Sequence, residues 1–475
     1  MKKRILAILI TAALAVSVTG CASNATSGNG SGSASSATES SETSSKAEES
    51  DVSSAEESSD NSAEESSDNS AEESSDNSAE ESKDDSSQEE SKDLEANYTK
   101  YTLDGDLTQH MIDMSRLNEG NKVRLANVIK KLKNGEEVTV GFIGGSITQG
   151  TSAGNELCYA KLTADWLQQT YSSAKVNYVN AGIGATGSYI GVHRATADLL
   201  SKNPDLVFVE FSVNDTTENT ERNKDSYDSL LRTIWKSSTN PAIITIATTQ
   251  ENGTSFQDQH AEIVKHYDLP MISYKNTILD TIKHGDIVWK DISDDDIHPN
   301  VPGHKIVSQL LQAYISDVDK DIDSISGDES DFSTPATKAS FENGSLLTLA
   351  QAGDAVTMNG EFKVNEANFG GFDGYWFFKG SNKTDLSSTN LTFKVNAKEI
   401  GLLYGKYTKA GGTADIYIDD ELVTTLNADF TGGWGNYVEC AQLKSFDTAG
   451  EHIVKIVPKT TDGPSMFSVT ALAIA

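Results

Sequence analysis

Residues 138–150 read "VTVGFIGGSITQG", an apolar, β-branched run that passes directly into a glycine-rich turn. A short run of this kind predicts a buried strand, and the glycines predict a tight turn after it. Two functions fit such a turn. Its backbone can cradle a phosphate, or it can expose the hydroxyl of Ser146 as a nucleophile.

The same pattern of a short apolar run followed by a longer helical stretch continues along the chain to about residue 320. Alternation of this kind predicts a parallel sheet with helices on both faces, and ligands of such sheets bind at the carboxyl ends of the strands. The expected strands are 138–144, 175–181, 206–212, 242–248 and 271–274. The expected helices are 156–171, 191–201, 225–236 and 257–267, with a last one starting near Pro302.

Two phosphate-binding interpretations are weak. Gly145 and Gly150 fit the frame of a phosphate loop, but the next residue is Thr151 where that loop needs a lysine. Residues 182–187, "GIGATG", match a dinucleotide fingerprint, and Glu210 follows at a distance suited to a ribose contact. This fingerprint comes after the second strand instead of the first, so it carries little weight.

The nucleophile interpretation needs a base and a group that holds the base. The segment 293–300, "SDDDIHPN", supplies His298 as the base and Asp295 as the carboxylate that orients it. Pro299 predicts a loop there, and by itself the segment is typical of a solvated acidic turn. Asn214 follows the third strand, and the glycine-rich residues 180–187 follow the second. Both provide N–H donors for an oxyanion at the same sheet edge.

With these elements in this order, the chain resembles the SGNH (GDSL-like) hydrolases, a flavodoxin-like family of esterases and lipases, over residues 138–305. The resemblance implies a three-layer α/β fold in which Ser146 is the nucleophile and also an oxyanion donor. It implies Gly184 or Ala185 as the second donor and Asn214 as the third. Gly145 stands where the best-known form has Asp, as in the branch that includes carbohydrate acetylesterases.

The family has four short sequence blocks in a fixed order. The last of these blocks, D-x-x-H, aligns with residues 295–298 and favours Asp295 and His298 as the other two members of the catalytic triad. His304, at the start of the last helix, is expected to be structural. The resemblance implies neither a metal nor a cofactor.

The N-terminal fifth differs from the rest in composition. Residues 1–21 have a basic start, an apolar run and the ending "VTGC", which predicts a signal peptide with the lipobox of bacterial lipoproteins and a lipid on Cys21. Residues 22–95 are rich in Ser and acidic residues, with the eight-residue repeat "SAEESSDN". They contain 22 acidic and 3 basic residues and so contribute −19 of the formal net charge of −33. We expect a disordered, extended linker there.

The C-terminal region has many short strands separated by Gly, Asn and Asp. After a catalytic domain at 96–323 and a linker at 324–337, residues 338–475 are therefore predicted to form an all-β sandwich. Four of its aromatic residues, Tyr375, Trp376, Trp434 and Tyr437, are expected either to stack on sugar rings or to belong to the core. Cys158 and Cys440 are expected to be free thiols.

The sequence therefore predicts a lipid-anchored serine esterase on the extracellular face of a bacterial membrane. Its expected substrate is an O-acetylated polysaccharide such as xylan. The acidic charge argues against nucleic acid, and the membrane is expected to be contacted only through Cys21. Two alternatives stay open, a surface lipase or lysophospholipase with the same triad and a glycan-binding lipoprotein without activity.

Overall fold

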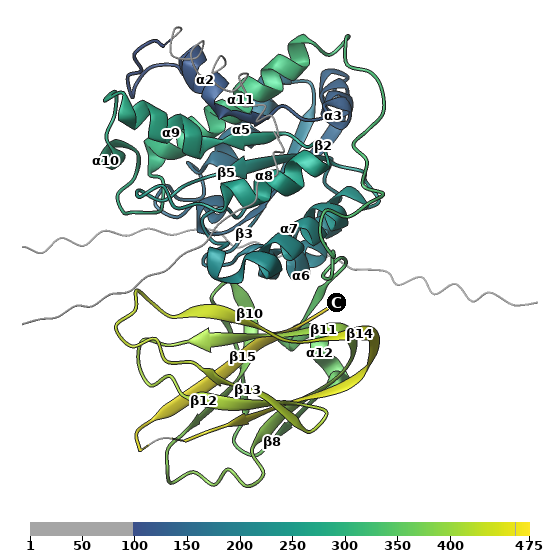
Figure 1. The fold of residues 1–475 in the computed structure, drawn as a ribbon, viewed down its shortest axis with the longest axis vertical. Helices are drawn as coiled ribbons and strands as arrows, with labels where there is room; N and C mark the ends of the chain where they lie inside the picture. The colour runs from purple at the N-terminus through teal and green to yellow at the C-terminus, as the bar shows by residue number, and fades with distance from the viewer. Residues whose placement is uncertain (1–97, 461) are drawn as a thin grey trace, which may run out of the picture. The chain divides into compact units, whose positions relative to one another are not determined.

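The structure of the protein, a computed structural model, describes residues 98–460 and 462–475 (Figure 1). The predicted signal peptide, Cys21 and the repeat segment 22–95 lie outside the described residues and stay predictions. No helix in the described ranges has the length and apolar composition needed to cross a membrane.

The first domain is built on a six-stranded sheet in the order β1-β6-β5-β4-β2-β3. Five of its strands are parallel, as predicted, and their ends differ from the expected ones by at most two residues. The short strand β1 was not predicted and pairs antiparallel with β6 at the edge. The strands are β1 (Arg116–Asn118), β2 (Glu137–Gly144), β3 (Lys175–Gly182), β4 (Leu206–Glu210), β5 (Ala242–Ala247) and β6 (Met271–Ser273).

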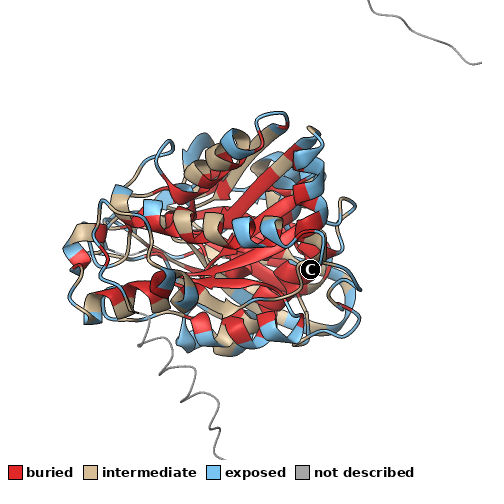
Figure 2. Ribbon diagram, turned by 90° about the horizontal axis from the view of Figure 1, so that it is seen from above, coloured by how far each residue is buried: buried red, intermediate tan, exposed pale blue. Residues whose placement is uncertain are grey.

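Helices cover both faces of this sheet and make it the middle of three layers. Side chains alternate across the sheet, so that Phe208 joins the core on one face while Val207 and Val209 join the core on the other. Figure 2 shows the buried strands between helices whose outer faces are exposed. The first face holds α2 (Gln109–Ser115), α3 (Val123–Lys133), α5 (Tyr159–Thr170), α9 (Tyr274–Lys283) and α11 (Val301–Lys320). The second face holds α6 (Ser188–Asp198), α7 (Thr220–Trp235) and α8 (Gln257–His266).

The second domain is all-antiparallel β, as predicted. Its strands are connected by hydrogen bonds into one sheet, in which three strands lie between β12 and β10. Ile416 of β12 and Phe378 of β10 nevertheless belong to the same hydrophobic core. The sheet therefore closes around that core. Its elements are β7 (Ser345–Thr348), α12 (Leu349–Ala352), β8 (Val356–Asn359), β9 (Lys363–Phe369), β10 (Phe372–Gly380), β11 (Asn390–Lys406), β12 (Thr413–Ile418), β13 (Glu421–Asn427), β14 (Tyr437–Pro458) and β15 (Ser465–Ile474).

The two domains share a hydrophobic core. Leu403, Val438 and Ala471 of the β domain belong to the same buried cluster as Tyr189 of α6 and Leu230 of α7. The two domains are therefore joined by buried apolar contacts as well as by the chain itself.

The segment expected to be a linker is also fixed. Residues 324–337 contain no helix or strand, but the ring of Phe332 stacks between Trp235 and Tyr267 at centroid distances of 4.5 and 3.9 Å. The N–H of Thr337 donates to Asp228 of α7 at 2.7 Å. The segment is therefore packed against the surface of the first domain.

Candidate active site

Three strand ends lie level at one edge of the parallel sheet. In the β2–β3 and β2–β4 pairings, Gly144 is the register partner of both Gly182 and Glu210. The loops that follow these strands carry Ser146, residues 184–185 and Asn214. The strand register therefore brings these three loops, with their predicted site residues, to the same edge of the sheet.

Ser146 starts the single-turn helix α4 (Ser146–Gln149), directly after two glycines. A Cβ atom on Gly144 would lie 2.1 Å from Oγ1 of Thr148 and 2.5 Å from the main-chain oxygen of Glu210. A side chain there would push the turn away from the strand end. Ser146 is only 9% exposed, so the turn leaves little of this residue open to solvent.

The structure brings Ser146, His298 and Asp295 into one hydrogen-bonded row. Nε2 of His298 lies 2.9 Å from Oγ of Ser146, and Nδ1 of His298 lies 2.8 Å from Oδ2 of Asp295. When Nδ1–H donates to the carboxylate, Nε2 is the unprotonated nitrogen and accepts from the serine hydroxyl. This arrangement can remove a proton from Ser146.

Asp295 is fixed as a carboxylate by its own loop. Its Oδ1 accepts from the N–H groups of Ile297 at 2.8 Å and His298 at 2.6 Å. Partial burial opposes ionisation, but these two bonds and the bond from the His298 ring outweigh it and lower the pKa of Asp295 below its ordinary value of 3.8. The indole of Trp289 and the hydroxyl of Ser293 donate to the main-chain oxygen of Asp295, which closes the loop.

The backbone distinguishes the two candidates for the second oxyanion donor. The N–H of Gly184 already donates to Oε1 of Gln149 at 3.0 Å. Ala185 has the left-handed φ of +57°, a conformation usual for glycine, and its N–H has no acceptor in the part of the chain that the structure describes. The geometry therefore favours Ala185 over Gly184.

Asn214 is held against the nucleophile turn. A Cβ atom on Gly145 would lie only 2.0 Å from Oδ1 of Asn214, and within the described ranges this buried oxygen has no hydrogen-bond partner. The next residue, Asp215, accepts from the N–H of Ser188 at 2.9 Å and lies 2.9 Å from Nε2 of the buried His260. These contacts fix the backbone that carries Asn214.

One supporting residue was missed by sequence reasoning. Arg194 of α6 is 1% exposed, and its guanidinium donates to the main-chain oxygens of Ala181 at 2.5 Å and Gly144 at 2.9 Å. It therefore joins the ends of β3 and β2 beneath the two loops. An arginine in the middle of a helical stretch carries no sequence signal for such a role.

Two other residues raised by the sequence lie away from the reaction. Glu210 is fully buried, and its Oε1 accepts from Ser212 and Thr248, so it is not placed to contact a ribose. His304 is also fully buried. Its Nδ1 accepts from the N–H of Tyr159, and burial lowers its pKa to about 4.

The four aromatic residues of the β domain that the sequence raised as sugar-stacking candidates differ in their exposure. Trp376 is 3% exposed and belongs to the core. Trp434 is 72% exposed and stacks on Tyr437 at a centroid distance of 5.1 Å, so this pair presents a ring surface to solvent. Tyr375 is half-buried and accepts from the side-chain amide of Asn365. Cys158 and Cys440 are free thiols, as predicted.

Comparisons with known proteins agree with this geometry. Residues 142–306 match the model of the GDSL-like lipase/acylhydrolase family. A crystal structure of a two-domain esterase active on acetylated mannans is 31% identical, with a TM-score of 0.70, and covers 76% of this chain and 97% of that chain. A second structure of such an esterase, co-crystallized with mannopentaose, is 30% identical over the same shares, with a TM-score of 0.68. No functionally curated protein matches the chain.

The fold, the two-domain organisation and these relatives define an ester hydrolase. The chain belongs to the GDSL-like lipase/acylhydrolase family.

Proposed function

We propose that the protein is a serine esterase that removes O-acetyl groups from a polysaccharide, with a mannan as the first candidate. The observation that carries this proposal is the hydrogen-bonded row from Ser146 through His298 to Asp295. In this row each group has the partner that it needs for nucleophilic catalysis.

The reaction follows from this order of groups. Oγ of Ser146 attacks the ester carbonyl while Nε2 of His298 takes its proton, and Asp295 stabilises the imidazolium. The N–H groups of Ser146 and Ala185 and the side-chain amide of Asn214 hold the oxyanion. His298 then gives the proton to the departing sugar alkoxide. Water, activated by His298, releases acetate from Ser146 in the second half of the cycle.

The mannan is suggested by the relatives, since the two-domain esterase that aligns over most of this chain is active on acetylated mannans. Acetylated xylan, the substrate expected from the sequence, stays a prediction.

The exposed ring pair Trp434–Tyr437 supports a carbohydrate substrate. A Cβ atom on Gly370 would lie 2.7 Å from Cγ2 of Val438, next to Tyr437, and one on Gly371 would lie 2.4 Å from Cγ2 of Ile183. Ile183 directly precedes the loop that holds Gly184 and Ala185. The turn between β9 and β10 thus connects the ring pair with the oxyanion loop, and we place the sugar chain across both.

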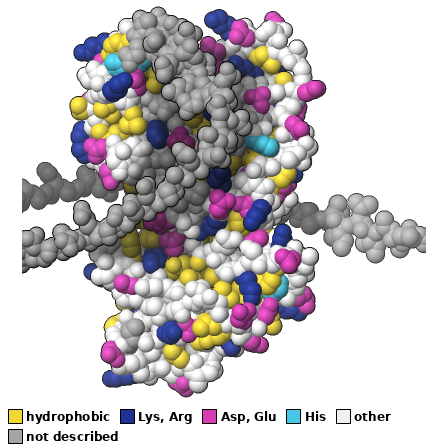
Figure 3. Space-filling model, in the orientation of Figure 1, with side chains coloured by type: hydrophobic (Ala, Val, Ile, Leu, Met, Phe, Trp, Pro, Cys, Tyr) yellow, Lys and Arg dark blue, Asp and Glu magenta, His cyan; other side chains and the backbone are white. Residues whose placement is uncertain are grey.

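We also propose an extracellular, lipid-anchored location. This rests on the lipobox-like ending at Cys21 and on the acidic segment 22–95, which would extend away from the membrane. On the part of the face in Figure 3 that the grey residues leave uncovered, Lys and Arg side chains are scattered among Asp and Glu and form no continuous basic stripe.

The test is acetate release from acetylated mannan, acetylated xylan and p-nitrophenyl esters of increasing chain length, measured beside Ser146→Ala. The proposal expects turnover of acetyl esters that Ser146→Ala abolishes. A preference for long acyl chains would instead indicate a lipase. Binding of the glycan without turnover of any ester would indicate a glycan-binding protein.

The ring pair has its own test. Trp434→Ala is expected to raise KM for the polysaccharide about 3- to 10-fold, since one aromatic contact contributes about 0.5–1.5 kcal/mol. KM for p-nitrophenyl acetate should not change. Leu422→Ala, which removes another exposed apolar side chain of the same domain, is the matched control. An equal effect on both substrates would contradict the assignment of the pair to sugar binding.

A further inference from the structure

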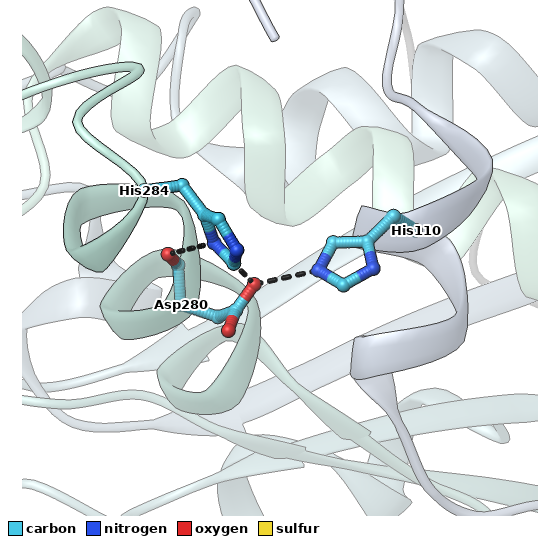
Figure 4. A group of neighbouring side chains, drawn as sticks. All are labelled: His110, Asp280 and His284. Carbon is cyan, nitrogen blue, oxygen red and sulfur yellow. Dashed lines mark hydrogen bonds and ion pairs between the residues drawn. The ribbon is translucent and has the colours of Figure 1, made fainter. Parts of the chain in front are cut away.

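Two histidines share one carboxylate in the first domain (Figure 4). Nε2 of His110 lies 2.6 Å from Oδ2 of Asp280, and Nδ1 of His284 lies 3.3 Å from the same oxygen. One possible ligand atom from each residue lies within 4.8 Å of the others. We call these three residues the His–Asp–His cluster.

The cluster joins two separate helices. Asp280 and His284 are four residues apart in α9 and its C-cap, so both side chains lie on one face of the helix. His110 comes from α2, which packs on α9. The distance in the sequence between His110 and Asp280 explains why no metal-ligand spacing is visible there.

The surroundings of the cluster are partly closed. The side chains of His110, Asp280 and His284 are 4%, 12% and 17% exposed. The ring of Tyr98 stacks on His284 at 4.2 Å and meets His110 edge-on at 5.5 Å. The hydroxyl of Tyr98 donates to Oδ1 of Asp286 at 2.5 Å, which holds this ring in place. An aromatic ring packed against the two imidazoles limits the access of solvent to the His–Asp–His cluster.

The donor set selects the kind of ion. Two imidazoles and one carboxylate suit zinc and related transition metals, whereas calcium and magnesium prefer oxygen ligands alone. Zinc bonds of about 2.0–2.2 Å place neighbouring ligand atoms roughly 3.3 Å apart in a tetrahedron. The separations of 2.6 and 3.3 Å from Oδ2 of Asp280 lie near that value, and all three ligand atoms lie within 4.8 Å of one another.

We propose that the His–Asp–His cluster binds a divalent transition-metal ion, zinc first among them, and that this ion clamps α2 to α9. In this role the metal replaces the proton between Nε2 of His110 and Oδ2 of Asp280 and a proton on Nδ1 of His284, a nitrogen that also lies 3.0 Å from the main-chain oxygen of Asp280. The ion stabilises the folded protein and takes no part in ester hydrolysis, which uses Ser146, His298 and Asp295.

The test is calorimetric titration of the purified, chelator-treated full-length protein with zinc chloride, together with thermal unfolding at increasing zinc. We expect one site per chain and a Tm that rises with zinc concentration. Replacement of one ligand should lower the affinity at least as much as loss of a residue that only orients a ligand, which costs about 10- to 100-fold. The variants are His110→Gln and Asp280→Asn, whose amides retain a hydrogen bond at this place and so favour folding.

The matched control is His452→Gln. His452 also pairs with a carboxylate, with its Nδ1 2.7 Å from Oδ2 of Asp419, and it belongs to no group of three metal-ligating residues in the described ranges. Its zinc response should equal that of the wild type. Esterase activity confirms that each variant is folded. Cobalt gives a second readout, a visible absorption band that His110→Gln should abolish.

Two results would overturn the proposal. The first is a wild-type protein whose Tm and titration do not respond to zinc, which would leave the cluster as a hydrogen-bonded structural contact. The second is a zinc response that His110→Gln and Asp280→Asn leave unchanged, which would place the ion elsewhere, for example on the acidic segment 22–95.

Discussion

The replacement Gly145→Ala tests how the nucleophile turn and Asn214 fit together. Gly145 has a φ of −87°, outside the left-handed region that favours glycine. The added Cβ would lie 2.0 Å from Oδ1 and 2.9 Å from Cγ of Asn214. Because no side chain can remain at such distances, the amide of Asn214 must turn away from the oxyanion site.

The expected magnitude is that of losing one oxyanion donor. Removal of such a donor costs about 10²- to 10³-fold in kcat, or about 2.7–4 kcal/mol of transition-state stabilisation. The cost in stability should be smaller, about 1 kcal/mol, because the atoms displaced are the end of one half-buried side chain. KM for a small acetyl ester should change little, since the oxyanion forms only in the transition state.

A double-mutant cycle with Asn214→Ala makes this prediction specific. The assay is hydrolysis of p-nitrophenyl acetate, with thermal unfolding as the control for folding. If Gly145→Ala acts through Asn214, the double variant should be no slower than Asn214→Ala alone. A Gly145→Ala variant with wild-type kcat would refute this reasoning, and so would losses that simply add.

Three further predictions concern Asp295, Ala185 and Arg194. Asp295→Asn should lower kcat by about 10⁴-fold, the size known for the corresponding change in another serine hydrolase. Because the folded pKa of Asp295 is lowered, its carboxylate contributes stability above pH 3.8 that is lost as the pH falls through the lower folded value. The free energy of unfolding of Asp295→Asn should therefore lack this decrease at low pH. A variant whose stability depends on acid pH in the same way as that of the wild type would contradict the lowered pKa of Asp295. Ala185→Gly should raise the free energy of unfolding by about 0.5–1 kcal/mol, because release from the left-handed φ exceeds the added chain entropy. The Ala185→Gly variant should retain its activity. A lower free energy of unfolding in urea than that of the wild type would show that the backbone of Ala185 is not strained. Arg194→Met should lower the free energy of unfolding by about 1–3 kcal/mol, because the main-chain oxygens of Ala181 and Gly144 lose a buried guanidinium donor, while that of Gly144 keeps the N–H of Ile183. It should also lower kcat, and an equally stable, equally active variant would show that these bonds do not position the loops.

The central strands of the parallel sheet were predictable because they are buried on both faces. Such strands read as continuous β-branched runs, as in "LVFVE" of β4 and "AIITIA" of β5. β1 has only three residues and pairs with β6 through tertiary contact, so no local pattern marks it. The helix starts were less accurate. α7 begins at Thr220, five residues before the expected start, in a polar stretch without apolar periodicity.

The sequence predicted which short segments form the active site and their order along the chain, but not the contacts between them. The choice between Gly184 and Ala185 depends on a backbone angle and on the side chain of Gln149, which packs from a different loop. The support from Arg194 likewise depends on two strand ends that meet only in the folded sheet. The His–Asp–His cluster joins residues 170 positions apart, beyond the reach of any spacing rule.

The most direct test of the account is the identity of the residue that becomes covalently modified. The protein would be treated with a fluorophosphonate, which traps activated serines, and the adduct located by peptide mass spectrometry. The account predicts one adduct, on Ser146, that forms together with the loss of acetate release and is absent from Ser146→Ala. An adduct on another residue, or acetate release that persists in Ser146→Ala, would contradict it.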